Sequence, residues 1–479
     1  MKMQKLGRVA AYLLVLLGAA LATGCSHFGH YPVNAPLEKY TPGYGYIAQN
    51  LGQAGNSEDL MLVLSFSGGG TRAAAFSYGV LEGLRATEVP IGGKKRRLLD
   101  EVDVISGVSG GSFTAAYYGL YGDRIFEDYE SRFLKKNVQG DILTAMFLNP
   151  VNWFRLSSPN FDRSDLAAEY YDENVFDRKT FGDILERKGP LILINATDMS
   201  MGSRFVFHQR YFDAICSDLS KFPVARACAA SSAVPGVLTP ITVKNYAGSC
   251  GFILPTMRGT ESRNFRVREM REHMELVLDV KKKSYFHLID GGVADNLGLR
   301  SLEETVDAMG NFWTAMKVTG REKVRKIVLI VVNAESKTES QWDKAEVVPP
   351  LSAILGNYST IAIVRYNRET MAVLQESFGR WIDQIREGRC PPGQISTEPG
   401  SCGDIEFYLV DIRFRNLENE AEADYLAGLP TTFRLSPEEV DRLKAAGRKI
   451  LTESDDYRKF LRDLDAEERQ GPGNSGNVR

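Results

Sequence analysis

The feature that most constrains the fold is a strand-like run that passes through three consecutive glycines into a helix-like run. The segment LVLSFSGGGTRAAAFSYGVLEGL occupies residues 62–84, with the three glycines at 68–70. Glycine destabilises the interior of a strand or a helix, so three in a row indicate a turn in which bare backbone is needed. Units of strand, turn and helix are typical of parallel sheets with helices packed on their faces.

The strand–turn–helix pattern recurs through most of the chain. Further strand-like runs occupy 190–197, 203–209 and 405–414, and the longest apolar run of the mature chain, VRKIVLIVVNA, occupies 324–334. A run that is apolar on both faces is typical of a central strand in a parallel sheet. The sequence therefore predicts an α/β fold, a three-layer sandwich whose mostly parallel central sheet carries helices on both faces.

The N-terminus has the features of a secretory signal. Lys2, Lys5 and Arg8 precede an almost wholly apolar run over 9–22, and the segment ends in LATGC with Cys25 last. The run is too short and wrongly flanked for a stable membrane span. It predicts a signal peptide whose removal leaves Cys25 to be acylated, as in a bacterial lipoprotein. A plain secreted protein is the alternative.

Lipidation would anchor the chain in a bacterial cell envelope, and Ser26, rather than Asp, after the acylated cysteine favours the outer membrane. The residues that follow are rich in Pro, Gly, Tyr and Asn and lack periodicity, as a tether does. The expected organisation is a signal peptide over 1–24, a lipid-anchored tether over 25–60, a main α/β domain over 61–335, a mixed α/β C-terminal extension over 336–465 and a disordered tail over 466–479.

The balance of charge argues against some partners. The formal net charge of the whole chain is −3, and it becomes −6 once the three signal cations are removed. A weakly acidic chain argues against a nucleic-acid partner and against a polybasic membrane patch. Attachment to a membrane is therefore expected through the lipid on Cys25.

Five cysteines lie beyond the lipidation site, and export makes disulfides possible. Cys390 and Cys402 flank a segment rich in Pro and Gly, and they are expected to staple a surface loop. Cys216 and Cys250 can also pair, and Cys228, in an apolar run, is expected to be a buried free thiol. There is no CxxC motif and no Cys/His cluster in the sequence, so no metal and no cofactor are predicted.

A candidate nucleophile follows another short strand. In VDVISGVSGGS, Gly107, Ser109 and Gly111 form the pattern G-x-S-x-G between a strand and a helix. This is the setting of a nucleophile elbow, in which a serine lies on a strained tight turn between neighbours without bulk. A nucleophilic serine needs a base to take its proton.

A histidine base is difficult to find. His27 and His30 lie in the expected tether, His208 in a predicted strand and His273 in a charged helical run, and no histidine follows His287. In an α/β-hydrolase the order along the chain is Ser, acid, then His. We expect structural or surface roles for the three histidines outside the tether.

Asp290 is the alternative base. It ends a predicted strand and is followed by Gly291 and Gly292, so its carboxylate can approach another tight turn closely. Paired with Ser109, it would accept the serine proton directly. A carboxylate is a weak base whose ordinary pKa is near ~4, so partial burial has to raise its basicity.

The opening glycine run fits the remaining requirement, an oxyanion hole. Attack on an ester creates an oxyanion, and the bare N–H groups of 68–70 can converge on it. Arg72 either braces this loop or adds positive charge. Phosphate binding is the competing use of such a turn. However, the loop lacks G-x-x-x-x-G-K-[ST], and Ala73 stands where G-x-G-x-x-G needs its third glycine.

Taken in order, GGG-x-R, G-x-S-x-G and D-G-G resemble the motifs of the patatin-like phospholipase family over roughly residues 60–335. The small-residue segment ACAASSAVPGVLTP at 227–240 is also similar to one in that family, whereas Ser67 departs from the Asp that usually begins the loop. The resemblance implies a patatin-like sandwich with these roles: nucleophile Ser109, base Asp290, elbow glycines Gly107 and Gly111, and oxyanion hole Gly68, Gly69, Gly70 and Arg72.

The sequence therefore predicts a carboxylic ester hydrolase of the phospholipase A or lysophospholipase type. Its expected partner is a phospholipid or another acyl-ester substrate, cleaved through the Ser–Asp dyad. Two alternatives stay open: a non-lipid esterase or thioesterase with the same machinery, and a catalytically inactive envelope scaffold. Contacts to a head group cannot be read from the sequence.

Overall fold

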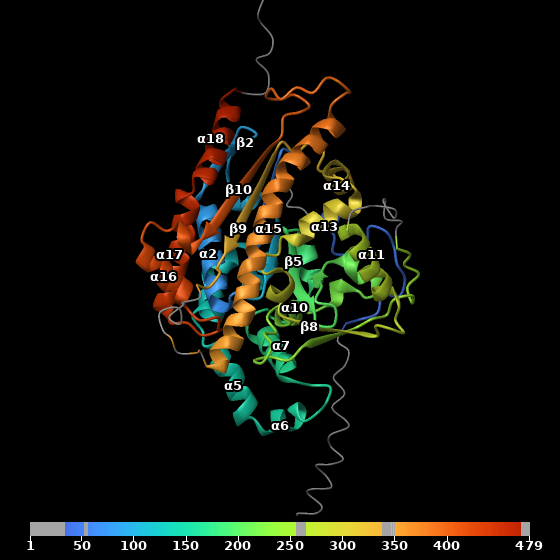
Figure 1. The fold of residues 1–479 in the computed structure, drawn as a ribbon, viewed down its shortest axis with the longest axis vertical. Coiled ribbons are helices and arrows are strands. Elements are labelled where there is room, and N and C mark those ends of the chain that lie inside the picture. The colour runs from blue at the N-terminus through green and yellow to red at the C-terminus, as the bar shows by residue number, and fades with distance from the viewer. Residues whose placement is uncertain are drawn as a thin grey trace, which may run out of the picture.

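A computed structural model describes residues 34–51, 56–254, 265–337, 346, 348 and 350–470. Its centre is an eight-stranded sheet in the order β10–β9–β1–β4–β5–β8–β7, with β6 paired to β5 (Figure 1). Neighbours from β10 to β5 run parallel, whereas β6 and β8 pair antiparallel to β5, and β7 pairs antiparallel to β8. The strands are β1 (Leu60–Phe66), β4 (Val102–Val108), β5 (Leu191–Asp198), β6 (Arg204–Phe207), β7 (Ile241–Lys244), β8 (Tyr285–Ile289), β9 (Lys326–Asn333) and β10 (Glu406–Arg413).

Strand β9 shows how the layers arise. All of its residues are buried, the even-numbered ones of 328–332 in one hydrophobic core and the odd-numbered ones of 327–331 in another. Because successive side chains of a strand point to opposite faces, one apolar run serves both cores. The predicted α/β sandwich with a mostly parallel sheet and helices on both faces is confirmed.

The two faces of the sheet are covered by helices from different parts of the chain (Figure 1). One face carries α2 (Gly70–Ala86), α3 (Gly110–Tyr121), α17 (Pro437–Glu453) and α18 (Asp455–Gln470). The other carries α13 (Arg300–Met309), α14 (Phe312–Thr319) and the long α15 (Leu351–Arg389). The remaining helices used below are α5 (Val138–Leu148), α6 (Pro150–Leu156), α7 (Arg163–Asn174), α10 (Val224–Ser231) and α12 (Gly292–Asp295).

The C-terminal segments are built into this sandwich. β10 pairs with β9 over its whole length, and α17 packs directly on α2. The two helices approach so closely that a Cβ on Gly79 would lie 2.1 Å from the carbonyl oxygen of Lys444, and one on Gly447 would lie 2.4 Å from that of Phe76. The segment expected as an extension over 336–465 therefore supplies a strand and covering helices to the same sheet. α18 continues to Gln470, inside the expected tail, and residues 471–479 lie outside the described part.

The expected tether does not hold for residues 34–51, which pack on the domain. Tyr46 is fully buried, and its hydroxyl donates to the carbonyl oxygen of Ile192 in β5 at 3.1 Å. Aromatic burial of this kind outweighs the lack of regular secondary structure. The predicted signal peptide over 1–24 and Cys25 lie outside the described residues. Among the described helices, none combines the length and the apolar character needed to cross a bilayer.

Both helices that follow the glycine motifs begin earlier than their apolar residues indicate. The first apolar residues after the glycines are Ala73 and Phe113, but α2 and α3 already start at Gly70 and Gly110. The first-turn N–H groups of a helix have no partner within the helix, so glycine costs little there and leaves these groups accessible. The helix starts are thereby brought to the edge of the sheet where the motifs lie.

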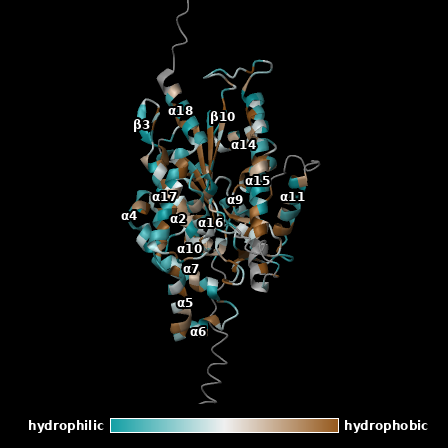
Figure 2. Ribbon diagram, turned by 60° about the vertical axis from the view of Figure 1, so that its left-hand side comes forward, coloured by the Kyte–Doolittle hydropathy of each residue, from teal (hydrophilic) through white to brown (hydrophobic). Residues whose placement is uncertain are grey.

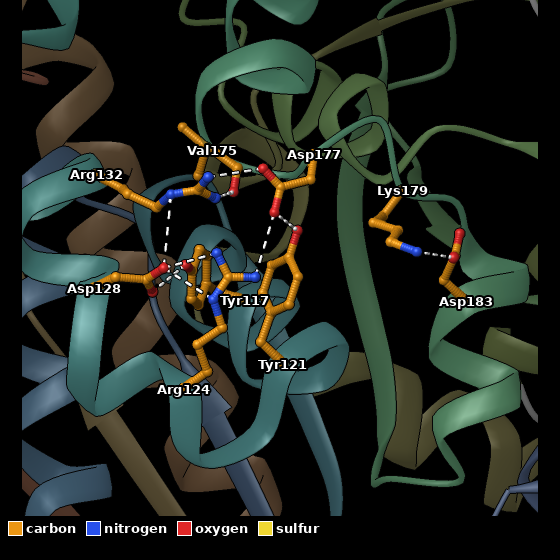
Figure 3. A network of polar contacts seen from close by, with 9 residues as sticks. All are labelled: Tyr117, Tyr121, Arg124, Asp128, Arg132, Val175, Asp177, Lys179 and Asp183. Carbon is orange, nitrogen blue, oxygen red and sulfur yellow. Dashed lines mark hydrogen bonds and ion pairs between the residues drawn. The ribbon is translucent and has the colours of Figure 1, made fainter.

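A network of charged and tyrosine side chains supports the C-terminal end of α3 (Figure 3). Arg124 lies 2.8 Å from Asp128 and 3.4 Å from Asp177, and Asp177 also pairs with Arg132 at 2.8 Å. The hydroxyl of Tyr121, the last residue of α3, donates to Asp177 at 3.1 Å. Single exposed ion pairs contribute little, but this network ties α3 to the segment that follows α7.

The cysteines pair as the sequence indicates. Cys216 and Cys250 form one disulfide, Cys390 and Cys402 form the other, and Cys228 is free and buried. The predictions of a stapled loop at 390–402 and of a buried free thiol are confirmed.

Candidate active site

Ser109 lies between the end of β4 and the first residue of α3. Its backbone has φ 47° and ψ −122°, a conformation that is uncommon for a residue with a side chain. The surrounding glycines are required by close approach: a Cβ on Gly107 would lie 2.7 Å from Ser112 Cα, and one on Gly111 would lie 2.6 Å from the carbonyl oxygen of Phe66. Strain held in place by such tight packing is typical of a nucleophile elbow.

Asp290 follows β8 and reaches Ser109 from the other side of β5. The hydroxyl of Ser109 donates to Asp290 Oδ2 at 2.8 Å, although the two residues are 181 positions apart. The other carboxylate oxygen, Oδ1, accepts from Gly292 N–H at 2.7 Å. The two side chains predicted to form a dyad are therefore in direct contact, and both are buried.

The position of Asp290 depends on the register of two antiparallel strands. The end of β8 pairs with the end of β5, with Ile289 opposite Thr197. The Thr197 hydroxyl then donates to the main-chain oxygen of Asp290 at 2.8 Å and accepts from Ala294 N–H at 3.1 Å. These two hydrogen bonds hold the Asp–Gly–Gly turn at the carboxyl ends of β4 and β5, where the elbow lies.

Burial raises the pKa of the Asp290 carboxyl to about 6, although the hydrogen bonds from Ser109 and Gly292 oppose that rise. An aspartate ordinarily titrates near ~3.9. Desolvation disfavours the charged form, which makes the carboxylate a stronger base once it is ionised. The low basicity that makes aspartate a poor partner for serine is thus partly corrected by its surroundings.

A pH profile follows from this shift. If ionised Asp290 takes the serine proton, kcat/KM for a neutral short-chain ester should fall below pH about 6, roughly tenfold for each further pH unit. The measurement is initial-rate hydrolysis in buffers of constant ionic strength from about pH 3 to about 8. An acid limb near pH 4, the ordinary aspartate value, would contradict the raised pKa.

The glycine loop lies beside the elbow because β1 and β4 are parallel and in register, with Phe66 opposite Gly107. Gly68 N–H donates to the main-chain oxygen of Asn296 at 3.2 Å. Gly69 and Gly70 N–H donate to no residue in the described part of the chain. The expectation that all three glycines supply oxyanion donors is therefore corrected to two, at the positive end of α2.

Arg72 bonds segments that are distant in the chain from the glycine loop. Its buried guanidinium donates to the carbonyl oxygens of Ala334, at 3.0 Å, and Leu429, and to the hydroxyl of Thr431 at 3.3 Å. The expectation that Arg72 donates at the oxyanion hole is wrong, because the hydrogen bonds of its guanidinium go to other segments. Of the two roles considered for it, the structure supports bracing the loop.

The sequence patterns did not predict three contacts around the site. Ser109 N–H donates to Ser231 Oγ at 2.8 Å, and the Ser231 hydroxyl donates to the carbonyl oxygen of Asn195. Asn296 places its side-chain oxygen 2.6 Å from where a Cβ of Gly68 would lie, so it fills the space between the glycine loop and the Asp290 turn. Ser231 belongs to the small-residue segment at 227–240, and that segment was the one sequence feature that could have indicated these contacts.

The three histidines in the described part of the chain are bonded elsewhere. His208 Nδ1 accepts from Arg210 N–H at 3.3 Å, His273 Nε2 pairs with a tyrosine hydroxyl at 3.1 Å, and His287 Nδ1 pairs with a threonine hydroxyl at 3.0 Å. None of these contacts reaches Ser109. Among the described residues, no group of three or more His, Cys, Asp and Glu side chains is placed to hold a metal ion.

Comparison with known proteins finds one family model that matches the part of the chain carrying this arrangement. Residues 64–302, which contain the glycine loop, the elbow and the Asp290 turn, match the family model described as patatin-like phospholipase. A search of the curated proteins found no match.

Among solved structures, human GIVD cytosolic phospholipase A2 is similar at 13% identity with a TM-score of 0.45, over 86% of this chain and 63% of that chain. The alignment thus spans less than two thirds of that chain. The type III effector protein ExoU is similar at 15% identity with a TM-score of 0.22, over 92% of this chain and 82% of that chain.

Proposed function

We propose that the protein is a serine hydrolase that cleaves the acyl esters of phospholipids or lysophospholipids. The observation that carries the proposal is the 2.8 Å hydrogen bond from the strained Ser109 to Asp290. It lies beside the N–H groups of Gly69 and Gly70, which have no acceptor among the described residues. The match of residues 64–302 to the patatin-like phospholipase family supports a lipid acyl ester as the substrate class.

In the proposed first step, Ser109 Oγ attacks the carbonyl carbon of the ester while its proton passes to Asp290. The carbonyl oxygen becomes an oxyanion that accepts hydrogen bonds from Gly69 and Gly70 N–H. When the ester carbon–oxygen bond breaks, Asp290 gives the proton to the leaving alkoxide. The products of this step are an alcohol, such as a lysophospholipid, and an acyl-enzyme.

In the second step, water attacks the acyl-enzyme. Asp290 takes a proton from the water as the new carbon–oxygen bond forms, and the same N–H groups hold the oxyanion. Breakdown of this intermediate returns the proton to Ser109 Oγ and releases a fatty acid. A carboxylate with a raised pKa suits both directions of proton transfer near neutral pH.

We also propose that the chain is an outer-membrane lipoprotein of a bacterial cell envelope, anchored through acylated Cys25. The support is the cationic and apolar leader that ends in LATGC. This anchor would keep the enzyme close to a lipid substrate without a basic surface patch.

A covalent probe tests the catalytic proposal. Incubation of the purified protein with a fluorophosphonate should add one phosphonyl group, and peptide mapping should place it on Ser109. Prior reaction with the probe should prevent release of fatty acid from phospholipid. Absence of labelling at Ser109 would favour the inactive-scaffold alternative. Labelling together with hydrolysis of short esters but of no lipid would favour the non-lipid esterase.

A further inference from the structure

The hairpin of α5 and α6 extends from one end of the molecule (Figure 1). It exposes large apolar side chains. Six of them are between 43% and 75% accessible: Leu143, Phe147, Leu148, Val151, Trp153 and Phe154. No charged residue occurs in the thirteen positions 142–154. Figure 2 shows hydrophobic residues concentrated on both helices. Exposed apolar side chains that gather on one excursion in this way mark an interaction site.

Both ends of this excursion are fixed to the candidate active site. At its start, Gln139 N–H donates to the carbonyl oxygen of Phe433 at 3.3 Å, and the neighbouring Thr432 oxygen accepts from Thr71 N–H, next to the glycine loop, at 2.8 Å. At its end, the first turn of α7 bonds Thr239 through Ser164 at 3.0 Å. The same 233–239 segment provides the carbonyl oxygen that accepts from Asp290 N–H at 3.0 Å.

Several polar groups near the tip of the hairpin are satisfied within it. Trp153 Nε1 donates to the carbonyl oxygen of Phe147 at 3.0 Å, and Asn152 Nδ2 donates to that of Ala145 at 2.9 Å. Asn149 caps α6 by accepting from Val151 N–H at 3.0 Å. Two carbonyl oxygens in the last turn of α5, those of Ala145 and Phe147, thus accept hydrogen bonds from side chains of the hairpin, while its large apolar side chains are exposed. This is the arrangement that hydrocarbon surroundings demand.

We propose that the α5–α6 hairpin inserts into the surface of a lipid bilayer and seats the active-site edge of the sheet on it. The inference rests on the proposed function, because a lipid substrate has to leave a bilayer to reach Ser109. Trp and Phe at the tip are the residues preferred at a membrane interface, and the absence of charge over 142–154 removes the desolvation cost of insertion. Val234 and Val237, next to the Ala233 carbonyl that bonds Asp290, and Val293, in α12 directly after Asp290, are also exposed.

Quenching by brominated lipid tests insertion directly. The full chain carrying Ser109→Ala, which keeps the lipid intact, is mixed with phosphatidylcholine–phosphatidylglycerol vesicles whose acyl chains carry bromine. We expect quenching of tryptophan fluorescence. The chain has four tryptophans, so the same measurement with added Trp153→Phe assigns the signal and should lose most of it. Equal quenching with and without Trp153 would overturn the proposal, even if the N-terminal lipid holds the protein on the vesicle.

Activity on two substrates tests the consequence. Leu148→Glu with Trp153→Glu should lower hydrolysis of vesicle phospholipid at least tenfold and leave hydrolysis of a monomeric short-chain ester within twofold. The control is Ile395→Glu, which also places a charge at an exposed apolar residue, 52% accessible, but in the Cys390–Cys402 loop outside the hairpin. It should alter neither rate. Unchanged vesicle hydrolysis, or equal loss on both substrates, would overturn the proposal.

Two further outcomes are distinguishable. A wild-type dimer in sedimentation velocity that the hairpin variant converts to monomer, without brominated-lipid quenching, would assign this surface to a second copy of the chain and overturn the bilayer proposal. If wild type hydrolyses neither substrate, the proposed function fails, whereas Trp153-dependent quenching would still support insertion.

Discussion

Ser109→Ala is expected to reduce kcat for short-chain ester hydrolysis by about 10⁴-fold or more, because no other group can form the acyl-enzyme. The residue lies at φ 47° and donates its N–H to Ser231 at 2.8 Å, and alanine keeps both features. The variant should therefore fold, although it loses the hydrogen bond from the Ser109 hydroxyl to Asp290. Activity is measured by spectrophotometric ester hydrolysis, and folding by circular dichroism.

Ser77→Ala is the matched control for this change. Ser77 is a buried serine of α2 whose hydroxyl has no hydrogen-bond partner among the described residues. Its removal should leave both activity and stability close to those of wild type, because no bond is lost. Retention of more than a few per cent of wild-type kcat by Ser109→Ala would rule out Ser109 as the nucleophile.

Asp290→Asn is expected to lower kcat by about 10³-fold or more, because an amide cannot take the serine proton at the rate of a positioned base. The substitution preserves shape, and its amide oxygen can still accept from Gly292 N–H at 2.7 Å. KM should change little, since the lost interaction forms only as the proton moves. Steady-state kinetics with the short-chain ester measures both constants. Near wild-type turnover would show that another group is the base.

The thermal stability of Asp290→Asn shows whether the variant has lost only its catalytic base or has also lost its fold. The folded-state pKa of Asp290 is raised to about 6, against ~3.9 in the unfolded chain, so the unfolded state releases this proton first as pH rises. Ionised Asp290 thus costs the native state on the order of 2–3 kcal/mol above pH 6, and this cost disappears as pH falls below about 4. Asp290→Asn should therefore be at least as resistant to heat as wild type at pH 8, with less advantage at acid pH. A lower thermal midpoint at pH 8 would contradict the burial argument.

The local parts of the site could be predicted because their requirements are local. A serine on a tight turn needs small neighbours at fixed spacing, and Gly107 and Gly111 met that requirement within a few residues of Ser109. Asp290 followed by two glycines was recognisable in the same way. The role of Arg72 was not, because the choice between facing the site and facing Ala334 and Leu429 depends on segments far away in the chain.

The N-terminal segment shows a similar limit. Residues 34–51 lack any periodic pattern, yet Tyr46 is buried against β5 and Asn34 bonds the carbonyl oxygen of Lys244 at 2.9 Å. An irregular segment that packs through single side chains leaves no repeat in the sequence. Composition alone therefore favoured a tether.

By itself, the sequence determined the apolar strands of the parallel sheet, the turns that need bare backbone, and the two side chains able to carry the chemistry. The reason is that steric demands and hydrophobic patterns act over neighbouring residues. Only the tertiary structure decided that the end of β8 pairs with the end of β5, which brings Asp290 to Ser109. It also decided that the main-chain oxygen of Asn296 accepts from Gly68 N–H, so that Gly69 and Gly70 are the glycines left to donate to an oxyanion. Packing of α17 on α2 likewise depended on contacts between residues hundreds of positions apart. Such contacts depend on the order of the strands in the sheet and on the packing of whole helix and sheet surfaces. A pattern of neighbouring residues does not contain this information.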